Sequence, residues 1–156
     1  MTQETDDLRK YPPCPRVGVG VLVMHHDKFL LVKREQEPAR GEWSVPGGLI
    51  ELGENYQTAA ARELYEECGI TAEIEAQPLL VFEFIDNDDQ HRVQYHFVVL
   101  DLLGRYKSGE LRVGSDIDKA QWFTLDELEM LECNDQIKTL ARRAFHQHPA
   151  LSTTTG

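Results

Sequence analysis

The sequence predicts an α/β fold in which a mixed β-sheet lies between helices. Strand-like apolar segments and helical segments are interleaved along the chain, but they do not follow strict strand–helix–strand alternation. The chain has 156 residues, of which 41% are hydrophobic, and this is enough to build one core without disulfide bonds. We therefore expect a single domain over residues 17–148, an N-terminal extension over residues 1–16 and a disordered tail over residues 149–156.

Two strands open the predicted domain. Residues 17–24 form the first strand, with valines on one face and Gly18 and Gly20 on the other. Because glycine in a strand lets another group approach the backbone closely, the glycine face either passes under a helix or forms the wall of a ligand site. Residues 26–28 make a turn, and residues 29–32 return as the second strand.

A polar loop and the first helix follow. Residues 35–42 contain a proline and a glycine and are expected to form a loop. Residues 43–46 are a short extended segment that ends in a turn at the next two glycines. Residues 55–68 are expected to form a helix, because Asn55 suits the N-cap, alanine and leucine favour helix, and Gly69 suits the position just after the helix.

Three further strands are expected in the second half of the chain. Residues 78–85 and 93–103 form a pair that is joined by a turn at the polar residues 86–89. In the later strand of this pair apolar and polar residues alternate, which is typical of a strand with one buried face. Residues 120–123 form a short last strand.

Two helices complete the prediction. Thr124 and Glu127 match a capping box, which starts a short helix that ends near Leu131. Residues 134–146 form an amphipathic helix. Its apolar face consists of Ile137, Leu140, Ala141 and Ala144.

The charge balance limits the partners that the chain can bind. Lys and Arg number 16 and Asp and Glu number 27, so the net charge is 16 − 27 = −11. Because phosphate backbones are held mainly by Lys and Arg, we expect no nucleic-acid polymer as a partner, and bound phosphate groups would need a cation as intermediary. The longest run of apolar residues and glycines, residues 17–24, is too short to span a membrane.

The cysteines and the N-terminus indicate a cytoplasmic protein. Cys14, Cys68 and Cys133 are scattered, odd in number and not at metal-site spacing, so we expect free thiols. Residues 1–10 are polar, and they resemble neither a secretory signal nor a transit peptide.

Three glutamates share one arc of the helix expected over residues 55–68. At about 100° per residue, Glu67 lies about 40° from Glu63 on one side and Glu66 lies about 60° from it on the other. The same wheel places Ala61, Leu64, Tyr65 and Cys68 on the buried side, and Tyr56, Ala59 and Ala60 beside the acids.

Such clustered acids indicate a cation site. Two carboxylates about 5 Å apart repel by roughly 3 kcal/mol at an effective dielectric constant of about 20. Arg62 offsets part of this repulsion, whereas Glu51 and Glu54 in the preceding loop add two more acids. Glutamate oxygens suit hard cations such as Mg²⁺ or Mn²⁺. The alternative is a solvated acidic helix face.

The segment from Gly48 to Ile70 resembles the Nudix box, the signature of the Nudix hydrolase family. It matches every fixed position: Gly48, Glu54, Arg62, Glu63, Leu64, Glu66, Glu67, Gly69 and Ile70. The flanking segments at 43–48 and 120–128 and the early glycine-rich strand are also similar, so the resemblance covers roughly Val17 to Leu131. It implies a Nudix α/β/α sandwich with a mixed sheet and an enzyme that hydrolyses nucleoside diphosphates linked to another group.

The resemblance also implies roles for the box residues. Glu63, Glu66 and Glu67 are expected to bind the divalent metal, usually Mg²⁺, and the Gly48 carbonyl often completes the site. Glu54 and Arg62 are expected to orient these carboxylates through a mutual ion pair. The metal neutralises the pyrophosphate and lowers the pKa of the water that attacks it.

The general base has several candidates. In the family it is either a glutamate of the box, here Glu63 or Glu66, or an acid on a later loop. The loop candidates are Asp116, Asp118 and Glu110, and we place Asp116 first because similar members have a metal ligand or base near that position. The alternative for Asp116 is an ordinary turn residue.

Four residues are expected to contact the substrate: Arg34, Arg40, Trp43 and Gly47. An arginine can bind phosphate with two parallel hydrogen bonds, and related enzymes often have an arginine near position 34. The alternative for both arginines is solvated surface charge. Trp43 can stack on a base or pack in the core.

The substrate is expected to resemble ADP-ribose. Residues 37–48 resemble ADP-ribose pyrophosphatase-like members, and a polar loop at 105–119 is expected to reach a bound pyrophosphate. One alternative is an (oxidised) nucleoside triphosphate, for which Lys33, Arg34, Arg40 and Arg112 are the candidate phosphate ligands. A more remote alternative is a sensor that binds a nucleotide without turnover. Many family members dimerise, so a homodimer is also expected.

Overall fold

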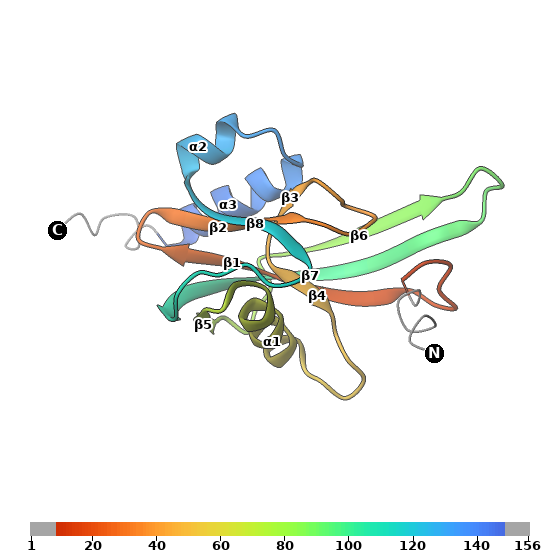
Figure 1. Ribbon diagram of the computed structural model, residues 1–156, viewed down its shortest axis with the longest axis horizontal. Coiled ribbons are helices and arrows are strands. Elements are labelled where there is room, and N and C mark those ends of the chain that lie inside the picture. The colour runs from red at the N-terminus through yellow and green to blue at the C-terminus, as the bar shows by residue number, and fades with distance from the viewer. Residues whose placement is uncertain (1–8, 149–156) are drawn as a thin grey trace.

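The computed structural model describes residues 9–148 as a mixed sheet with helices on both faces (Figure 1). Helix α1 (Tyr56–Cys68) covers one face, and helices α2 (Leu125–Met130) and α3 (Asp135–Gln147) cover the other. The strands are β1 (Arg16–His25), β2 (Lys28–Arg34), β3 (Trp43–Ser44), β4 (Gly47–Leu49), β5 (Thr71–Ile74), β6 (Leu80–Asn87), β7 (Val93–Ser108) and β8 (Ile117–Thr124). The predicted α/β/α sandwich with a mixed sheet is confirmed.

Strand β1 organises the sheet. It pairs in parallel with β7 and antiparallel with β2 and β4. Strand β2 also pairs with β3 and β8, and β7 also pairs with β5 and β6; all of these pairs are antiparallel. The sheet is mixed because β1 and β7, which are far apart in the sequence, lie side by side in parallel.

Strands β1 and β2 separate beyond the hairpin that joins them. They pair at the hairpin itself, where Met24 lies opposite Phe29. Further from it, residues 18–20 of β1 pair with β4, whereas residues 32–33 of β2 pair with β3. Residues 43–49 therefore fill the opening between the two strands.

The core has one layer on each face of the sheet. Alternating side chains of β1 divide between the layers, with Val21 and Val23 under α1 and Leu22 and Met24 on the side of α3. The predicted apolar face of the last helix is confirmed as buried. Two packed layers of this kind hold the sheet rigidly beneath the loops at its edge.

The predicted helix ends are confirmed. The Asn55 side chain accepts a hydrogen bond from the Thr58 N–H at 2.9 Å, and Gly69 ends α1 in the left-handed conformation at φ 71°. Thr124 and Glu127 form the reciprocal capping box of α2.

The predicted turn at Gly47 and Gly48 is wrong, because both residues belong to β4. They lie opposite Gly20 and Val19 of β1. A Cβ at position 47 would lie 2.0 Å from the carbonyl oxygen of Val19. The missing side chain, which suggests a turn in the sequence, instead allows a strand to lie in the narrow opening.

Strand β7 is longer than predicted and runs to Ser108. Its second half pairs with β5, a short strand that the sequence analysis did not predict, and Ala72 lies opposite Tyr106. The polar loop expected at 105–119 is therefore shorter, since its two ends belong to β7 and β8 and only residues 109–116 lie between them.

The turn between β6 and β7 lies two residues later than predicted. Strand β6 continues to Asn87, and residues 88–92 form the tip. Asp88 accepts hydrogen bonds from the backbone N–H groups of Gln90 and Arg92, each at 2.9 Å. These bonds favour the turn at Asp88 rather than at the acids before it.

Some expectations fall on residues outside the described range. The predicted disordered tail at 149–156 and the first half of the N-terminal extension belong to this group. Between residues 9 and 148, no helix combines the length and the apolar character that crossing a membrane requires.

An acidic side chain is buried within the sheet. Asp101 of β7 is 3% exposed, and its Oδ1 atom has no hydrogen-bond partner among residues 9–148. It occupies the space above Gly20 of β1, where a Cβ would lie 2.3 Å from Oδ1. Burial raises the pKa of Asp101 to about 7.

Replacing Asp101 with Asn should remove a loss of stability that grows with pH. As the pH rises from about 4 to 7, the unfolded chain ionises this carboxyl group while the folded chain keeps its proton, so the free energy of unfolding falls. We expect the wild type to lose about 2 to 4 kcal/mol over this range relative to Asp101→Asn. Urea unfolding at pH 4.5 and 7.5 measures this loss of stability, and Asp86→Asn, at an exposed aspartate, is the control. Parallel pH profiles for wild type and Asp101→Asn would contradict this expectation.

Candidate active site

Part of the acidic arc of α1 faces the sheet, since Glu67 is buried and Glu63 is half-buried, whereas Glu66 is exposed. The buried residues of α1 are Ala59, Ala60, Leu64, Glu67 and Cys68. The placement of Ala61 and Tyr65 on the buried side is therefore wrong, and Tyr65 is 55% exposed. A helical wheel assigns the buried side to the apolar residues because acids usually avoid the interior. Glu67, at 6% exposure, lies within the buried face instead.

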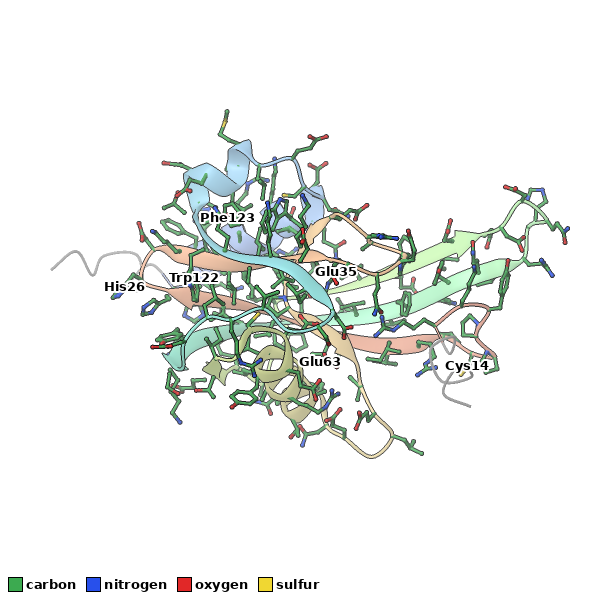
Figure 2. All side chains as sticks on the ribbon, viewed as in Figure 1. Cys14, His26, Glu35, Glu63, Trp122 and Phe123 are labelled. Carbon is green, nitrogen blue, oxygen red and sulfur yellow. The ribbon has the colours of Figure 1, made fainter. Side chains whose placement is uncertain are left out.

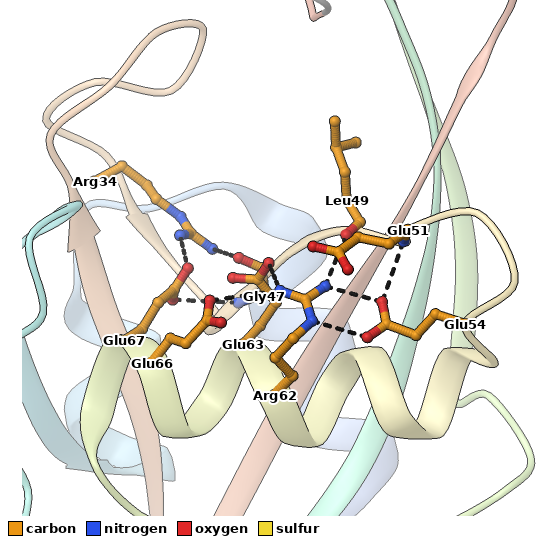
Figure 3. A network of polar contacts seen from close by, with 9 residues as sticks. All are labelled: Arg34, Gly47, Leu49, Glu51, Glu54, Arg62, Glu63, Glu66 and Glu67. Atoms are coloured by element: carbon orange, nitrogen blue, oxygen red, sulfur yellow. Dashed lines mark hydrogen bonds and ion pairs between the residues drawn. The ribbon is translucent and has the colours of Figure 1, made fainter. Parts of the chain in front are cut away.

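Glu67 can be buried because an arginine from β2 neutralises it. Arg34 donates from Nη1 to Glu67 Oε1 at 2.7 Å, and the Gly47 N–H lies 3.3 Å from Oε2 (Figure 3). Arg34 also donates to the Val45 carbonyl at 2.8 Å and contacts that of Gly47 at 3.4 Å. Burial still outweighs these contacts and raises the pKa of Glu67. Arg34 thus fixes this carboxylate against the opening filled by residues 43–49.

A second arginine holds the other end of the acidic arc. Arg62 binds Glu54 with two hydrogen bonds, from Nε at 2.8 Å and from Nη2 at 2.9 Å. The predicted ion pair between these residues is confirmed, and it lowers the pKa of Glu54 to about 2. The same guanidinium donates to Glu63 Oε1 at 2.8 Å, reaches Glu66 at 3.4 Å and donates to the Leu49 carbonyl at 3.2 Å. Arg62 therefore links the loop before the helix to its carboxylates.

Glu63 lies directly against the backbone of β4. A Cβ at Gly48 would be 2.5 Å from Glu63 Cδ, so glycine makes room for this carboxylate. Burial raises the pKa of Glu63, and Arg62 opposes the change. The Gly48 backbone thus lies beside the carboxylate with which it is expected to share a metal.

A cleft of about 460 Å³ opens beside these carboxylates. Its lining consists of Glu63, Tyr65, Glu66, Glu67, Arg112, Gly114, Ser115 and Asp116. The loop at 109–116 is bound to the end of α1, because the N–H groups of Arg112 and Gly114 donate to the carbonyls of Cys68 and Glu67 at 2.9 and 2.8 Å. This anchoring brings Asp116, which is distant from the box in the sequence, next to the box glutamates. The volume suits a small-molecule ligand.

Asp116 is the loop acid that the structure brings to the cleft. It is exposed and accepts a hydrogen bond from Gln36 Nε2 at 3.1 Å. The other loop candidates, Asp118 and Glu110, are exposed but do not line the cleft. Asp118 lies where β8 carries one extra residue opposite β2, between the partners of Lys33 and Arg34.

The expected substrate contacts are dispersed. Gly47 and Arg34 lie at the carboxylates, whereas Arg40 is exposed and makes no side-chain hydrogen bond or ion pair with the rest of residues 9–148. Trp43 packs on the opposite face of the sheet, edge-on to Phe123 at 5.2 Å. Figure 2 shows Phe123 on the side of α2 and α3 and Glu63 on the side of α1. Core packing, one of the two alternatives for Trp43, is the contact observed.

Some residues of the site have no recognisable signal in the sequence. The carbonyls of Val45 and Leu49 bind the two arginines through backbone atoms, which any residue type provides. Tyr65 lines the cleft with the Arg112 guanidinium 5.5 Å from its ring centre. This contact depends on the path of a loop more than 40 residues away in the sequence.

The donor chemistry fits a hard divalent cation. Carboxylate oxygens of Glu63, Glu66 and Glu67 face one cleft, and oxygen ligands of this kind suit Mg²⁺ and Mn²⁺. Within residues 9–148 no three acidic, His or Cys side chains are grouped closely enough to hold a metal ion as they stand, and Arg34 and Arg62 each hold one of the carboxylates. A cation would take over part of the role of these arginines at the oxygens.

Comparison with known proteins agrees with this geometry. Residues 15–145 match the NUDIX domain model. An ADP-ribose pyrophosphatase from Methanocaldococcus jannaschii is 35% identical over 127 residues, which are 80% of this chain and 72% of that protein. The crystal structure of a MutT NUDIX hydrolase from Burkholderia pseudomallei has a TM-score of 0.71 at 32% identity and covers 83% of this chain and 98% of its own.

A third relative is matched over a shorter stretch. A low-salt glycan biosynthesis protein from Haloferax volcanii is 40% identical over 75 residues, 48% of each chain, so this chain spans only about half of that protein's length in the match. The domain match, which covers most of the chain, and the archaeal ADP-ribose pyrophosphatase, which is 35% identical over 80% of it, decide the assignment. The chain belongs to the Nudix family, and it is a Nudix pyrophosphohydrolase.

Proposed function

We propose that this enzyme hydrolyses nucleoside diphosphates linked to another group, with ADP-ribose as the favoured substrate and Mg²⁺ or Mn²⁺ as the cofactor. The observation that carries the proposal is the cleft in which the box carboxylates meet Asp116. The archaeal relative that is named an ADP-ribose pyrophosphatase supports the choice of substrate.

In this proposal the carboxylates of Glu63, Glu66 and Glu67 and the Gly48 carbonyl hold the metal. When bound, the metal supplies charge neutralisation for the pyrophosphate and lowers the pKa of the attacking water. The protein contributes mainly positioning, which the ion pairs of the two arginines provide. Glu54 fixes Arg62, which donates directly to Glu63 and orients it, and Arg34 orients Glu67.

The general base is Asp116 or Glu66 in this proposal. Both carboxylates line the cleft, and both are solvent-accessible enough to take a proton from water. Glu63 is less suitable, since one of its oxygens accepts a short hydrogen bond from Arg62. Asp116 has the additional support of Gln36, which orients its carboxylate.

The four residues expected to contact the substrate lie in different places. Gly47 lies at the carboxylates, and Arg40 is free to bind phosphate, whereas Arg34 is engaged with Glu67 and Trp43 lies on the other face of the sheet. Among residues 9–148, Arg112 is the one basic side chain that lines the cleft. A nucleoside triphosphate would bring more negative charge beside the acids, so a cleft with so few basic side chains favours the diphosphate class.

We also propose a cytoplasmic location and a homodimer. Sedimentation velocity tests whether the protein is a dimer.

The test is a substrate panel with and without metal. We expect ADP-ribose to be cleaved to AMP and ribose 5-phosphate, with kcat/KM higher than for dGTP or 8-oxo-dGTP. EDTA should abolish the reaction, and added Mg²⁺ or Mn²⁺ should restore it. A preference for a triphosphate by more than about tenfold, or 1.4 kcal/mol, would replace the proposed substrate class. Turnover that persists in EDTA would overturn the proposed metal dependence.

A further inference from the structure

The last turn of α1 forms one end of the active-site cleft. Tyr65 and Arg112 line this end, and the box carboxylates line the rest together with the loop acid. At about 100° per residue, Tyr65 lies about 100° beyond Glu66 around the helix, on the side of Glu66 away from Glu63. The cleft therefore extends past the carboxylates to the C-terminal end of the helix.

Arg112 differs from the other two arginines near the carboxylates. Arg34 and Arg62 each form an ion pair with a box glutamate. Within residues 9–148, by contrast, Arg112 pairs with no carboxylate, although the exposed Asp116 lines the same cleft. Its guanidinium lies 5.5 Å from the centre of the Tyr65 ring, and Nη2 donates to the Tyr65 carbonyl at 3.3 Å. These contacts keep the charge of Arg112 apart from the acids that are expected to hold the metal.

The backbone, rather than the Arg112 side chain, fixes the loop that carries this residue. The N–H groups of Arg112 and Gly114 donate to the carbonyls of Cys68 and Glu67 at 2.9 and 2.8 Å. Gly69 leaves room for the exposed side chain to cross the helix end, since a Cβ there would lie 2.6 Å from Arg112 Cγ and Nε. A substitution that neutralises the guanidinium therefore leaves the loop in place.

A phosphate group at this end of the cleft needs a positive charge beside it. The box glutamates repel phosphate, and so do the last carbonyls of α1, which carry the partial negative charge of the helix end. A metal at the box neutralises the glutamates, but the helix end lies past them. A guanidinium has five N–H donors, and only one of those of Arg112 contacts Tyr65. The others are available for two phosphate oxygens at once.

We propose that Arg112 binds the phosphate group of the substrate pyrophosphate that lies away from the box carboxylates, and that Tyr65 positions Arg112 for this contact. The inference rests on the proposed function, because it requires a pyrophosphate, and it adds a phosphate contact that does not pass through the metal. Arginine stacks on an aromatic ring through its face, which leaves its N–H edge free. Because the contact is present before and during the reaction, it lowers KM rather than raising kcat.

Steady-state kinetics with ADP-ribose and Mg²⁺ test the contact. Arg112→Met removes the charge from a long side chain, and it should raise KM at least about tenfold while kcat changes by less than about threefold. Arg112→Lys should fall between, because an ammonium group cannot bind two oxygens in parallel. Tyr65→Leu should raise KM about threefold, and Tyr65→Phe, which keeps the ring, should recover most of this loss. Arg142→Met, at an exposed arginine of α3, is the matched control.

A binding measurement separates this inference from the proposed function. The analogue α,β-methylene-ADP carries two phosphates joined by a bridge that the enzyme cannot hydrolyse, and adenosine carries none. In titration calorimetry with Mg²⁺, Arg112→Met should weaken the binding of this analogue at least about tenfold and leave that of adenosine unchanged. The same result in an enzyme that does not cleave ADP-ribose would support the inference and overturn the proposed substrate.

Three results would overturn the inference. The first is a KM and an affinity for α,β-methylene-ADP that Arg112→Met leaves unchanged. The second is a fall in kcat at constant KM, because Arg112 would then act by placing Asp116, which follows it on the same loop. The third is a melting temperature of Arg112→Met several degrees below that of Arg142→Met, which would assign the side chain a structural role.

Discussion

Replacement of Glu67 by Gln is expected to lower kcat/KM at least about 10³-fold while the chain stays folded. The loss is the size expected when a major electrostatic group leaves an active site. Glutamine keeps the shape of the side chain and can still accept a hydrogen bond from Arg34, but it cannot supply the negative charge that a divalent cation requires. Burial and the neighbouring Glu63 both disfavour the charge of Glu67, so its removal relieves desolvation and like-charge repulsion, which offsets the weakened ion pair with Arg34, and we expect stability to change by about 1 kcal/mol or less.

The measurement combines kinetics and unfolding. Steady-state rates with Mg²⁺ give the change in kcat/KM, and thermal unfolding in EDTA gives the change in stability without metal. Glu51→Gln is the matched control, because Glu51 is an exposed acid of the same box that does not line the cleft. Full turnover by Glu67→Gln would remove Glu67 from the metal site. A large drop in the melting temperature would mean that the carboxylate is mainly structural.

The parts of the site that sequence could predict are those whose partners are near in the chain. Arg62 and Glu54 lie eight positions apart, and the helix places them together with little help from the rest of the fold. The caps of α1 depend on residues within one turn of its ends. Local spacing therefore predicts these contacts before any tertiary structure is known.

The burial of Glu67 could not be predicted in the same way. Its partner, Arg34, lies 33 positions earlier and reaches it only because β1 and β2 separate to admit residues 43–49. The buried state of Asp101 depends on Gly20, which becomes its neighbour through the parallel pairing of β1 and β7. Both acids look like surface residues in the sequence, because hydropathy carries no information on a distant counter-ion or a missing side chain.

The short strand β5 shows a different limit. Residues 71–74 alternate between polar and apolar residues, but over only four positions, which is the shortest run that such a pattern can indicate. The pairing with the second half of β7 makes them a strand, and it also turns residues 105–108 from an expected loop into strand.

A methyl group at position 48 is expected to reduce kcat/KM by roughly 10²-fold with little loss of stability. In Gly48→Ala the new Cβ would lie 2.5 Å from Glu63 Cδ, far below contact distance, so the carboxylate must move and its hydrogen bond to Arg62 must break or stretch. The atom in the way is the end of a flexible side chain, and a shift of about 1 Å at a catalytic group can cost about 10²-fold in rate.

Gly47→Ala is the matched comparison, because there the new Cβ would meet the backbone of β1 at the Val19 carbonyl. Backbone cannot move as a side-chain end can, so we expect this variant to lose about 1 to 3 kcal/mol of stability. Urea unfolding and kcat/KM for both variants test the contrast. A Gly48→Ala enzyme with wild-type rates would show that Glu63 does not need its position against β4, and equal destabilisation of the two variants would show that both glycines serve only the packing of the strand.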